Sequence, residues 1–247
     1  MKPIVEEDAW SALRAFTPAR IALGRTGNAL PLKEVLHFRM AHAHARDAVY
    51  SRLNVEGLDA LGLPVMALHS QARDRHTYLQ RPDLGRLLDE RSAATLEHGA
   101  YDLVFVIADG LSATAVNHHA VPLLHRLIPA LQETGIRLAP LCLLEEGRVA
   151  AGDPIAHLLG ARMSIVLIGE RPGLSAADSM GAYMTFAPRP GLTDESRNCV
   201  SNIRPEGLFY AAAADRLLHL IGASMRLGLS GVGLKDQSGG GENTFLE

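Results

Sequence analysis

Polar, glycine-containing turns follow the apolar runs in the second half of this chain, and they carry side chains that could do chemistry. Two carboxylates, a hydroxyl and two glycines lie at the ends of the runs 102–109 and 162–168, at Asp109, Gly110, Ser112, Gly169 and Glu170. Ligands of open parallel sheets bind where strands end and helices begin, because backbone N–H groups are exposed there. The sequence therefore predicts one rim, built from the turns 108–114, 145–149, 169–175 and 189–207.

The residues alone leave the chemistry of this rim open. Neither GxGxxG nor GxxxxGK[ST] is present, which argues against the usual dinucleotide and ATP sites. GLSAT (110–114) lacks the second glycine of a nucleophile elbow, so Asp109 and Ser112 could simply cap the next helix. Glu170 could be a surface charge beside Arg171, and Cys199 could be a loop cysteine without a role.

The cysteines and histidines do not indicate a metal site. Cys142 and Cys199 form no CxxC pair, so both are expected to be free thiols in a reducing compartment. His42 and His44 are two residues apart and would point to different faces of a helix. No metal ligand is therefore assigned in this chain.

An alternation of strands and helices must position the rim. The apolar runs 102–109, 136–144 and 162–168 are typical of strands covered on both faces, and helices are expected at 113–134 and 153–160. Further elements are a fourth strand at 180–187, a closing helix at 207–228, and earlier helices at 5–18, 33–53 and 84–97. This pattern predicts an α/β fold, with a mainly helical N-terminal region at 1–98 and a Rossmann-like parallel sheet domain at 99–247.

Composition narrows the class of protein. The chain is 47% hydrophobic and 21% charged, with a formal net charge of −3, as in a folded globular protein. Without a basic excess, nucleic acid is not an expected partner. The opening ten residues contain no apolar signal segment, and the apolar runs are too short to span a membrane. We therefore expect a cytoplasmic protein.

Several segments resemble one known family, the small subunit of ethanolamine ammonia-lyase. They cover most of residues 78–208 in the family's order, and ARIALGRTG (19–27) resembles it more loosely. The segments are YLQRPDLGR (78–86), VIADGLSATAV (106–116), GRVAAGDPIAHLLGA (147–161), IVLIGERPGLSAADSMGAYMTFAPRPG (165–191) and RNCVSNIRPEGL (197–208).

The resemblance implies a fold, a cofactor and a partner. The small subunit of that family has a Rossmann-type domain that holds adenosylcobalamin against a large TIM-barrel subunit, which carries the ethanolamine site. The resemblance implies conversion of ethanolamine to acetaldehyde and ammonia by a hetero-oligomer, with no catalytic residue in this chain and no activity by this chain alone. Its cobalamin contacts fall on Val149, Glu170 and Cys199, and weaker candidates are Asp109, Gly110, Ser112 and Gly169.

Two further expectations follow from comparison with the family, and one alternative function stays open. The chain lacks the DxHxxG motif that supplies an axial histidine in other cobalamin domains, so dimethylbenzimidazole is expected to stay on cobalt. Many relatives have a longer N-terminal extension, which puts residence in a bacterial microcompartment in doubt. The alternative function is a non-catalytic Rossmann-like module that binds another small ligand or only a protein partner.

Overall fold

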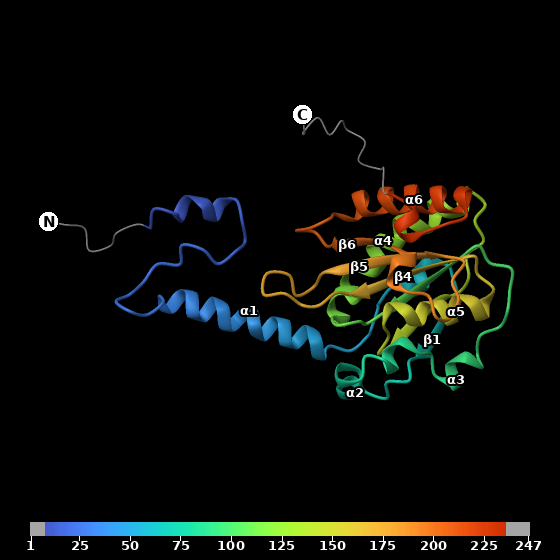
Figure 1. Cartoon of the computed structure of the whole chain (residues 1–247), viewed down its shortest axis with the longest axis horizontal. Coiled ribbons are helices and arrows are strands. Elements are labelled where there is room, and N and C mark those ends of the chain that lie inside the picture. Colours follow the sequence, from blue (N-terminus) through green and yellow to red (C-terminus); the bar gives the residue numbers. More distant parts are fainter. Residues whose placement is uncertain (1–7, 236–247) are drawn as a thin grey trace, which may run out of the picture.

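The computed structural model describes residues 8–235, and in it one mixed sheet forms the centre of the molecule (Figure 1). Its strand order is β1-β3-β2-β4-β5-β6. The first four strands pair in parallel, whereas β5 and β6 run antiparallel. The strands are β1 Val65–His69, β2 Leu103–Ala108, β3 Leu141–Glu145, β4 Met163–Gly169, β5 Met180–Phe186 and β6 Arg197–Ile203.

Helices cover both faces of this sheet. The long helices α4 (Ala113–Glu133) and α6 (Tyr210–Leu227) pack on one face, and α5 (Gly152–Leu159) packs on the other. Every residue of β2 and β4 is buried, which explains why both strands read as unbroken apolar runs. The mixed α/β fold with a helical N-terminal region, expected from the sequence, is confirmed. α4 also continues through Pro122 and Pro129.

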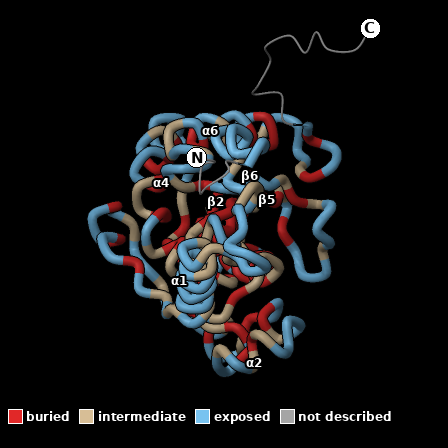
Figure 2. Tube along the Cα trace, turned by 90° about the vertical axis from the view of Figure 1, so that its left-hand side faces the viewer, coloured by how far each residue is buried: buried red, intermediate tan, exposed pale blue. Residues whose placement is uncertain are grey.

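The N-terminal region forms an arm and a small helical layer. The arm comprises a 3-10 turn, η1 (Ser11–Ala15), and helix α1 (Leu32–Tyr50), which projects from the body (Figures 1 and 2). Ala48 is the one buried residue of α1, because only the end of the helix meets the body. There Ser51 Oγ accepts a hydrogen bond from the Thr114 N–H at 2.9 Å. The small layer contains η2 (Leu58–Leu61), α2 (Arg75–Gln80), η3 (Leu84–Arg86) and α3 (Glu90–Ala93).

Four details differ from the sequence-based expectations. β1 comes from the region expected to be mainly helical, and the expected helix 84–97 is only η3 and the four-residue α3. The segment 189–207 is not one turn, because it contains η5 (Asp194–Ser196) and β6. The sheet is mixed because β5 returns antiparallel to β4. The start of β4, Met163, therefore pairs with the end of β5, Phe186. The turn after β5 lies at the end of the sheet opposite the expected rim.

Candidate functional site

Asp109 fastens the turns after β2 and β3 to each other. Its side chain is buried, and its two oxygens accept hydrogen bonds from the N–H groups of Glu146 and Gly147, both at 3.0 Å. Arg75 lies beside it, with Nη1 3.6 Å from Asp109 Oδ2 and 3.0 Å from Glu146 Oε2. Burial, reinforced by the charge of Glu146, raises the pKa of Asp109 to about 6.

Gly110, Ser112 and Gly169 close the space between the ends of β2 and β4. The Leu111 N–H donates to Gly169 O at 3.0 Å, and a Cβ on Gly169 would lie 2.0 Å from Ser112 O. Ser112 is fully buried; its hydroxyl accepts from the Ala115 N–H and donates to Ala177 O. These contacts make Ser112 a helix cap and argue against its use as a nucleophile. Together with Asp109, these residues position the rim.

Glu170 and Cys199 are brought together through a residue that sequence reasoning did not single out, Tyr183. Glu170 leaves the end of β4, and its carboxylate lies over Gly181 of β5, where an added Cβ would lie 3.0 Å from Oε1. The Ser179 hydroxyl donates to Glu170 Oε2, and the Asn202 N–H lies 3.4 Å from the same oxygen. Cys199 of β6 pairs with Tyr183 of β5 in the sheet.

The electrostatics of these three side chains are coupled. Burial raises the pKa of Tyr183, and the neighbouring Cys199 and Glu170 raise it further. The pKa of the Cys199 thiol is also raised, mainly because neighbouring groups partly desolvate the sulfur although the residue itself is exposed, while its hydrogen bond with Tyr183 acts in the opposite direction. Cys199 and Tyr183 are therefore neutral at pH 7, beside one carboxylate. Both cysteines are free, as expected, with Cys142 buried and Cys199 exposed.

Val149 lies on the same side of the sheet, in the 3-10 turn η4 (Val149–Ala151) before α5. Val149 and Tyr183 both pack against the hydrophobic cluster beneath α5. A buried ion pair ties the two segments together: Arg197, two residues before Cys199, contacts Asp153 at 2.7 and 2.8 Å. We use the name β5–β6 face for the surface formed by Gly181, Tyr183 and Cys199 with the Glu170 carboxylate over it, and Val149 lies on the same side of the sheet.

The supporting residues left only weak signals in the sequence. Tyr183 stands alone in an apolar strand, and Gly181 resembles any strand glycine. Asp153 and Arg197 are 44 residues apart, so only the folded chain shows that they pair. Their presence in the segments that resemble the family was the one available signal.

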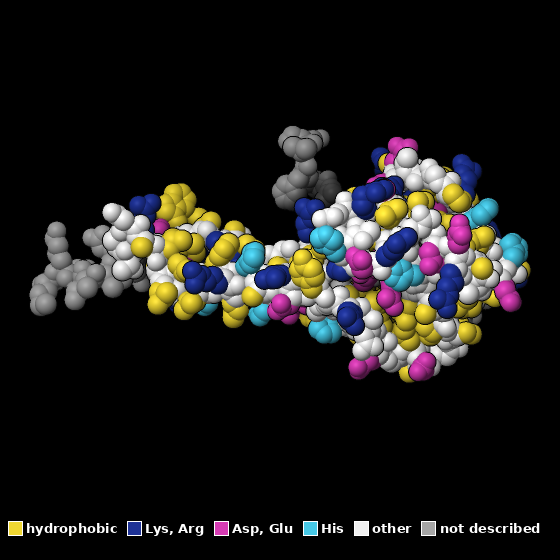
Figure 3. Space-filling view, turned by 90° about the horizontal axis from the view of Figure 1, so that it is seen from below, with side chains coloured by type: hydrophobic (Ala, Val, Ile, Leu, Met, Phe, Trp, Pro, Cys, Tyr) yellow, Lys and Arg dark blue, Asp and Glu magenta, His cyan; other side chains and the backbone are white. Residues whose placement is uncertain are grey.

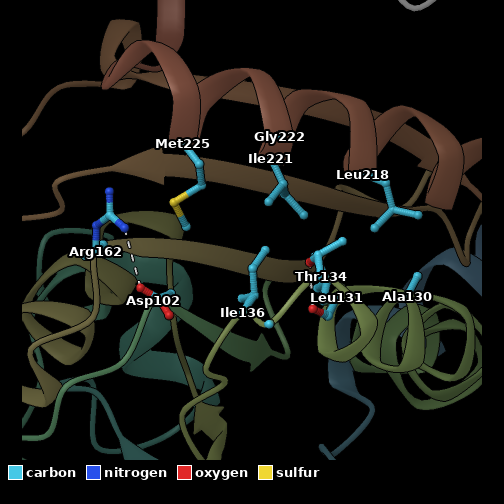
Figure 4. Close-up of a pocket in the computed structure, with 11 residues that line it drawn as sticks. Asp102, Ala130, Leu131, Thr134, Ile136, Arg162, Leu218, Ile221, Gly222 and Met225 are labelled. Carbon is cyan, nitrogen blue, oxygen red and sulfur yellow. Dashed lines mark hydrogen bonds and ion pairs between the residues drawn. The ribbon is translucent and has the colours of Figure 1, made fainter.

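A separate pocket lies at the other end of the sheet, where β2 and β4 begin. It has a volume of about 530 Å³ and lies between the ends of α4 and α6, with Leu131, Ile221 and Met225 among its apolar lining (Figure 4). Arg162 and Asp102 form an ion pair at one end, 3.5 Å apart. None of the residues expected to bind cobalamin lines this pocket.

Histidines and carboxylates form no metal site in the described part of the chain. Within residues 8–235, no group of three or more His, Cys, Asp and Glu side chains is placed to hold an ion. The buried His119 lies 2.8 Å from the Tyr210 hydroxyl through Nδ1 and 3.4 Å from Asp178 Oδ2 through Nε2. Across the same residues, no helix has both the length and the apolar character that a membrane crossing requires.

The fold defines an α/β protein with a mixed six-stranded sheet and a projecting arm that carries exposed apolar side chains. Residues 7–235 match the family described as ethanolamine ammonia-lyase light chain. Similar proteins named ethanolamine ammonia-lyase small subunit occur in Azotobacter vinelandii, 54% identical over 97% of this chain and 96% of that protein, and in Pseudomonas paraeruginosa, 54% identical over 94% and 89%. This chain belongs to the ethanolamine ammonia-lyase light chain family. It is a subunit of a lyase that acts in a complex.

Proposed function

We propose that this chain holds adenosylcobalamin at its interface with a larger, TIM-barrel subunit that converts ethanolamine to acetaldehyde and ammonia. The observation that carries the proposal is the β5–β6 face, where Glu170, Tyr183 and Cys199 lie close together, on the side of the sheet on which Val149 also packs. Family membership supports the same reading.

The residues of this face suit a corrin. A corrin is a broad apolar disc with amides at its margin, so its receptor needs apolar contacts and hydrogen-bond acceptors. Val149 and the Tyr183 ring supply apolar surface, and Glu170 supplies carboxylate oxygens. Cys199 is small and exposed, which permits close approach of a flat ligand.

The role of this chain is placement rather than acid–base catalysis. When bound, adenosylcobalamin supplies the radical chemistry that removes hydrogen from the substrate. Glu170 would orient the cofactor by accepting from amides, while its bond from Ser179 holds the carboxylate over Gly181. The Arg197–Asp153 pair would keep the segments of Cys199 and Val149 in register.

We further propose that dimethylbenzimidazole remains the lower ligand of cobalt. His119 is buried, and its two ring nitrogens face Tyr210 and Asp178 rather than an open surface. An electron paramagnetic resonance spectrum of the Co(II) form of the complex should show nitrogen coupling from the benzimidazole. The same coupling after uniform ¹⁵N labelling of the protein alone would confirm it, and a changed coupling would identify a histidine ligand.

The exposed apolar residues of the arm support the proposal that this chain binds a partner subunit. Trp10, Phe16, Leu32 and Leu36 are exposed on it, and Figure 3 shows hydrophobic side chains along its length with cationic groups among them. Large exposed apolar surfaces of this kind mark interaction sites. We place the complex in the cytoplasm, where two free thiols would stay reduced.

Reconstitution tests the proposal. The chain, its large subunit and hydroxocobalamin should elute together from gel filtration as a coloured complex, whereas each protein alone should retain less corrin. Adenosylcobalamin should then give acetaldehyde from ethanolamine only when both subunits are present. A colourless complex would favour the alternative, a module that binds only a protein partner or another ligand.

A further inference from the structure

A second hollow lies along the rim from the β5–β6 face, and its lining is cationic. This hollow, which we call the arginine pocket, has a volume of about 500 Å³ and lies between α1, α2 and the loop after β4. Its charged and titratable lining residues are His42, Arg46, Arg148 and Arg171, with no Asp or Glu. Four other hollows in the described residues each include at least one carboxylate.

Arg148 is held in this pocket without an anionic partner. Its guanidinium stacks on the buried Tyr78 ring, 4.4 Å from the ring centroid, and Arg75 stacks on the same ring at 4.8 Å. Arg75 contacts the nearby carboxylates of Glu146 and Asp109. Within residues 8–235, Arg148 forms no ion pair, and its Nε is buried without a hydrogen-bond partner.

The arginine pocket adjoins the residues proposed to contact cobalamin. Arg148 immediately precedes Val149, and Arg171 immediately follows Glu170. The Arg148 backbone is fixed, because its N–H donates to Gly85 O at 2.8 Å. A ligand that contacts Val149 and Glu170 would therefore lie next to the two segments whose arginines line the pocket.

We propose that the arginine pocket binds the phosphodiester of the cobalamin nucleotide loop, with Arg148 as the principal contact and Arg171 as a second one. This inference rests on the proposed cofactor. An unpaired guanidinium is matched to phosphate by charge and by its planar array of N–H donors. Stacking on Tyr78 orients Arg148 before the ligand arrives, which lowers the entropic cost of binding.

Two corrinoids isolate the contribution of the phosphate: adenosylcobinamide, which lacks phosphate, ribose and base, and adenosylcobinamide phosphate, which retains the phosphate but lacks ribose and base. Their dissociation constants for the complex of this chain with its large subunit would be measured by equilibrium dialysis, with detection by corrin absorbance. The wild-type complex should bind the phosphate-bearing compound ~10-fold more tightly, as for a charge-assisted hydrogen bond. Added NaCl or inorganic phosphate should reduce that preference.

Variants assign the preference to the pocket. Arg148→Met keeps an apolar stem over Tyr78 and should abolish the preference while leaving the affinity for adenosylcobinamide unchanged, which also shows that the complex is folded. Arg148→Lys should retain part of the preference, and the exposed Arg171→Gln should reduce it ~3-fold. Arg162→Met, in the pocket at the other end of the sheet, is the matched control and should change nothing.

The outcomes separate this inference from the proposed function. Loss of the preference in Arg148→Met, with normal cobinamide binding, would support the phosphate site. Equal binding of both compounds by the wild type, or an equal loss for both in Arg148→Met, would overturn it and leave the cobalamin assignment intact. Failure of the wild type to retain cobalamin at all would overturn both.

Discussion

Glu170 is the charged side chain that the β5–β6 face offers to a ligand, so its removal should show directly in cofactor binding. Glu170→Ala should weaken retention of cobalamin in the complex by ~10-fold, because a carboxylate acceptor for corrin amides is lost. Glu170→Gln should have a smaller effect, since one carbonyl oxygen remains. The measurement is the dissociation constant of hydroxocobalamin from the reconstituted complex.

The control for this prediction is a glutamate of the same chain that lies away from the face. Glu195 is exposed in the turn after β5, and Glu195→Ala should leave the dissociation constant unchanged. Unchanged affinity in Glu170→Ala would remove Glu170 from the site.

The raised pKa of Asp109 predicts how the stability of this chain depends on pH. Its pKa is about 6 in the folded chain and near its ordinary value of 3.8 in the unfolded chain, so the folded state holds the proton more tightly between pH 4 and 6. The free energy of unfolding should therefore fall as the pH rises through this window, by about 2–3 kcal/mol from this group. Above pH 6 its contribution should be constant.

Asp109→Asn isolates this contribution, because asparagine does not titrate. Urea unfolding of both proteins from pH 4 to 7 should show the wild type losing stability relative to the variant as the pH rises to 6. A stability difference that is independent of pH would contradict the raised pKa of Asp109.

At the residue scale, the sequence pointed to both ends of the site but not to what joins them. Glu170 and Cys199 lay in segments that resemble the family, and the structure links them through Tyr183 and Gly181. Those two residues belong to a strand whose role depends on its partners in the sheet. The expectation that Asp109 and Ser112 also contact a ligand stays a prediction; the structure shows that both side chains hold neighbouring turns in place through hydrogen bonds.

The more fully a strand is buried in the sheet, the more clearly the sequence predicted it. β2 and β4 are buried on both faces and therefore appear as apolar runs. β1 and β6 are the edge strands of the sheet, and each leaves polar or exposed positions on one side. Arg197, Asn198 and Ser201 make β6 look like a loop in the sequence, although its exposed positions belong to the face that we propose as the site.

The ion pair between Arg197 of β6 and Asp153 of α5 carries the prediction at this scale. Each side chain is only 2% exposed, and the pair is bidentate. Arg197→Met should lower the free energy of unfolding by ~3–5 kcal/mol, because it leaves the carboxylate buried and unpaired. Urea unfolding followed by circular dichroism measures this change.

A double variant tests the cause of that loss. Arg197→Met combined with Asp153→Leu should recover part of the stability, since no unpaired charge remains. Arg162→Met is the matched control, because Arg162 is 54% exposed in its pair with Asp102, and it should cost no more than ~1 kcal/mol. A double variant that is no more stable than Arg197→Met would show that packing, rather than the unpaired charge, explains the loss.

The whole molecule has an unusual division between a packed body and an arm with little core of its own. The arm is attached to the body near Ala48 and Ser51, and its other apolar residues are exposed (Figure 2). A helix of a globular protein normally packs such residues against the core. The sequence predicted this helix correctly but gave no sign that it leaves the body. Its apolar positions looked like those of any helix that packs on its own core, and only the tertiary structure shows them uncovered.

The arm should therefore matter for assembly more than for folding. Phe16, Leu32 and Leu36 are 85%, 71% and 53% exposed, so replacing all three by serine should leave the thermal unfolding of this chain nearly unchanged. Burial of these side chains against the large subunit would contribute ~1.5 kcal/mol or more for each, so association should weaken at least ~1,000-fold. Light scattering across a dilution series of the two subunits measures the dissociation constant. The matched control replaces Leu87, Leu227 and Val232, which are exposed on the body, by serine; equal weakening in both triple variants would mean that the arm has no special part in the interface.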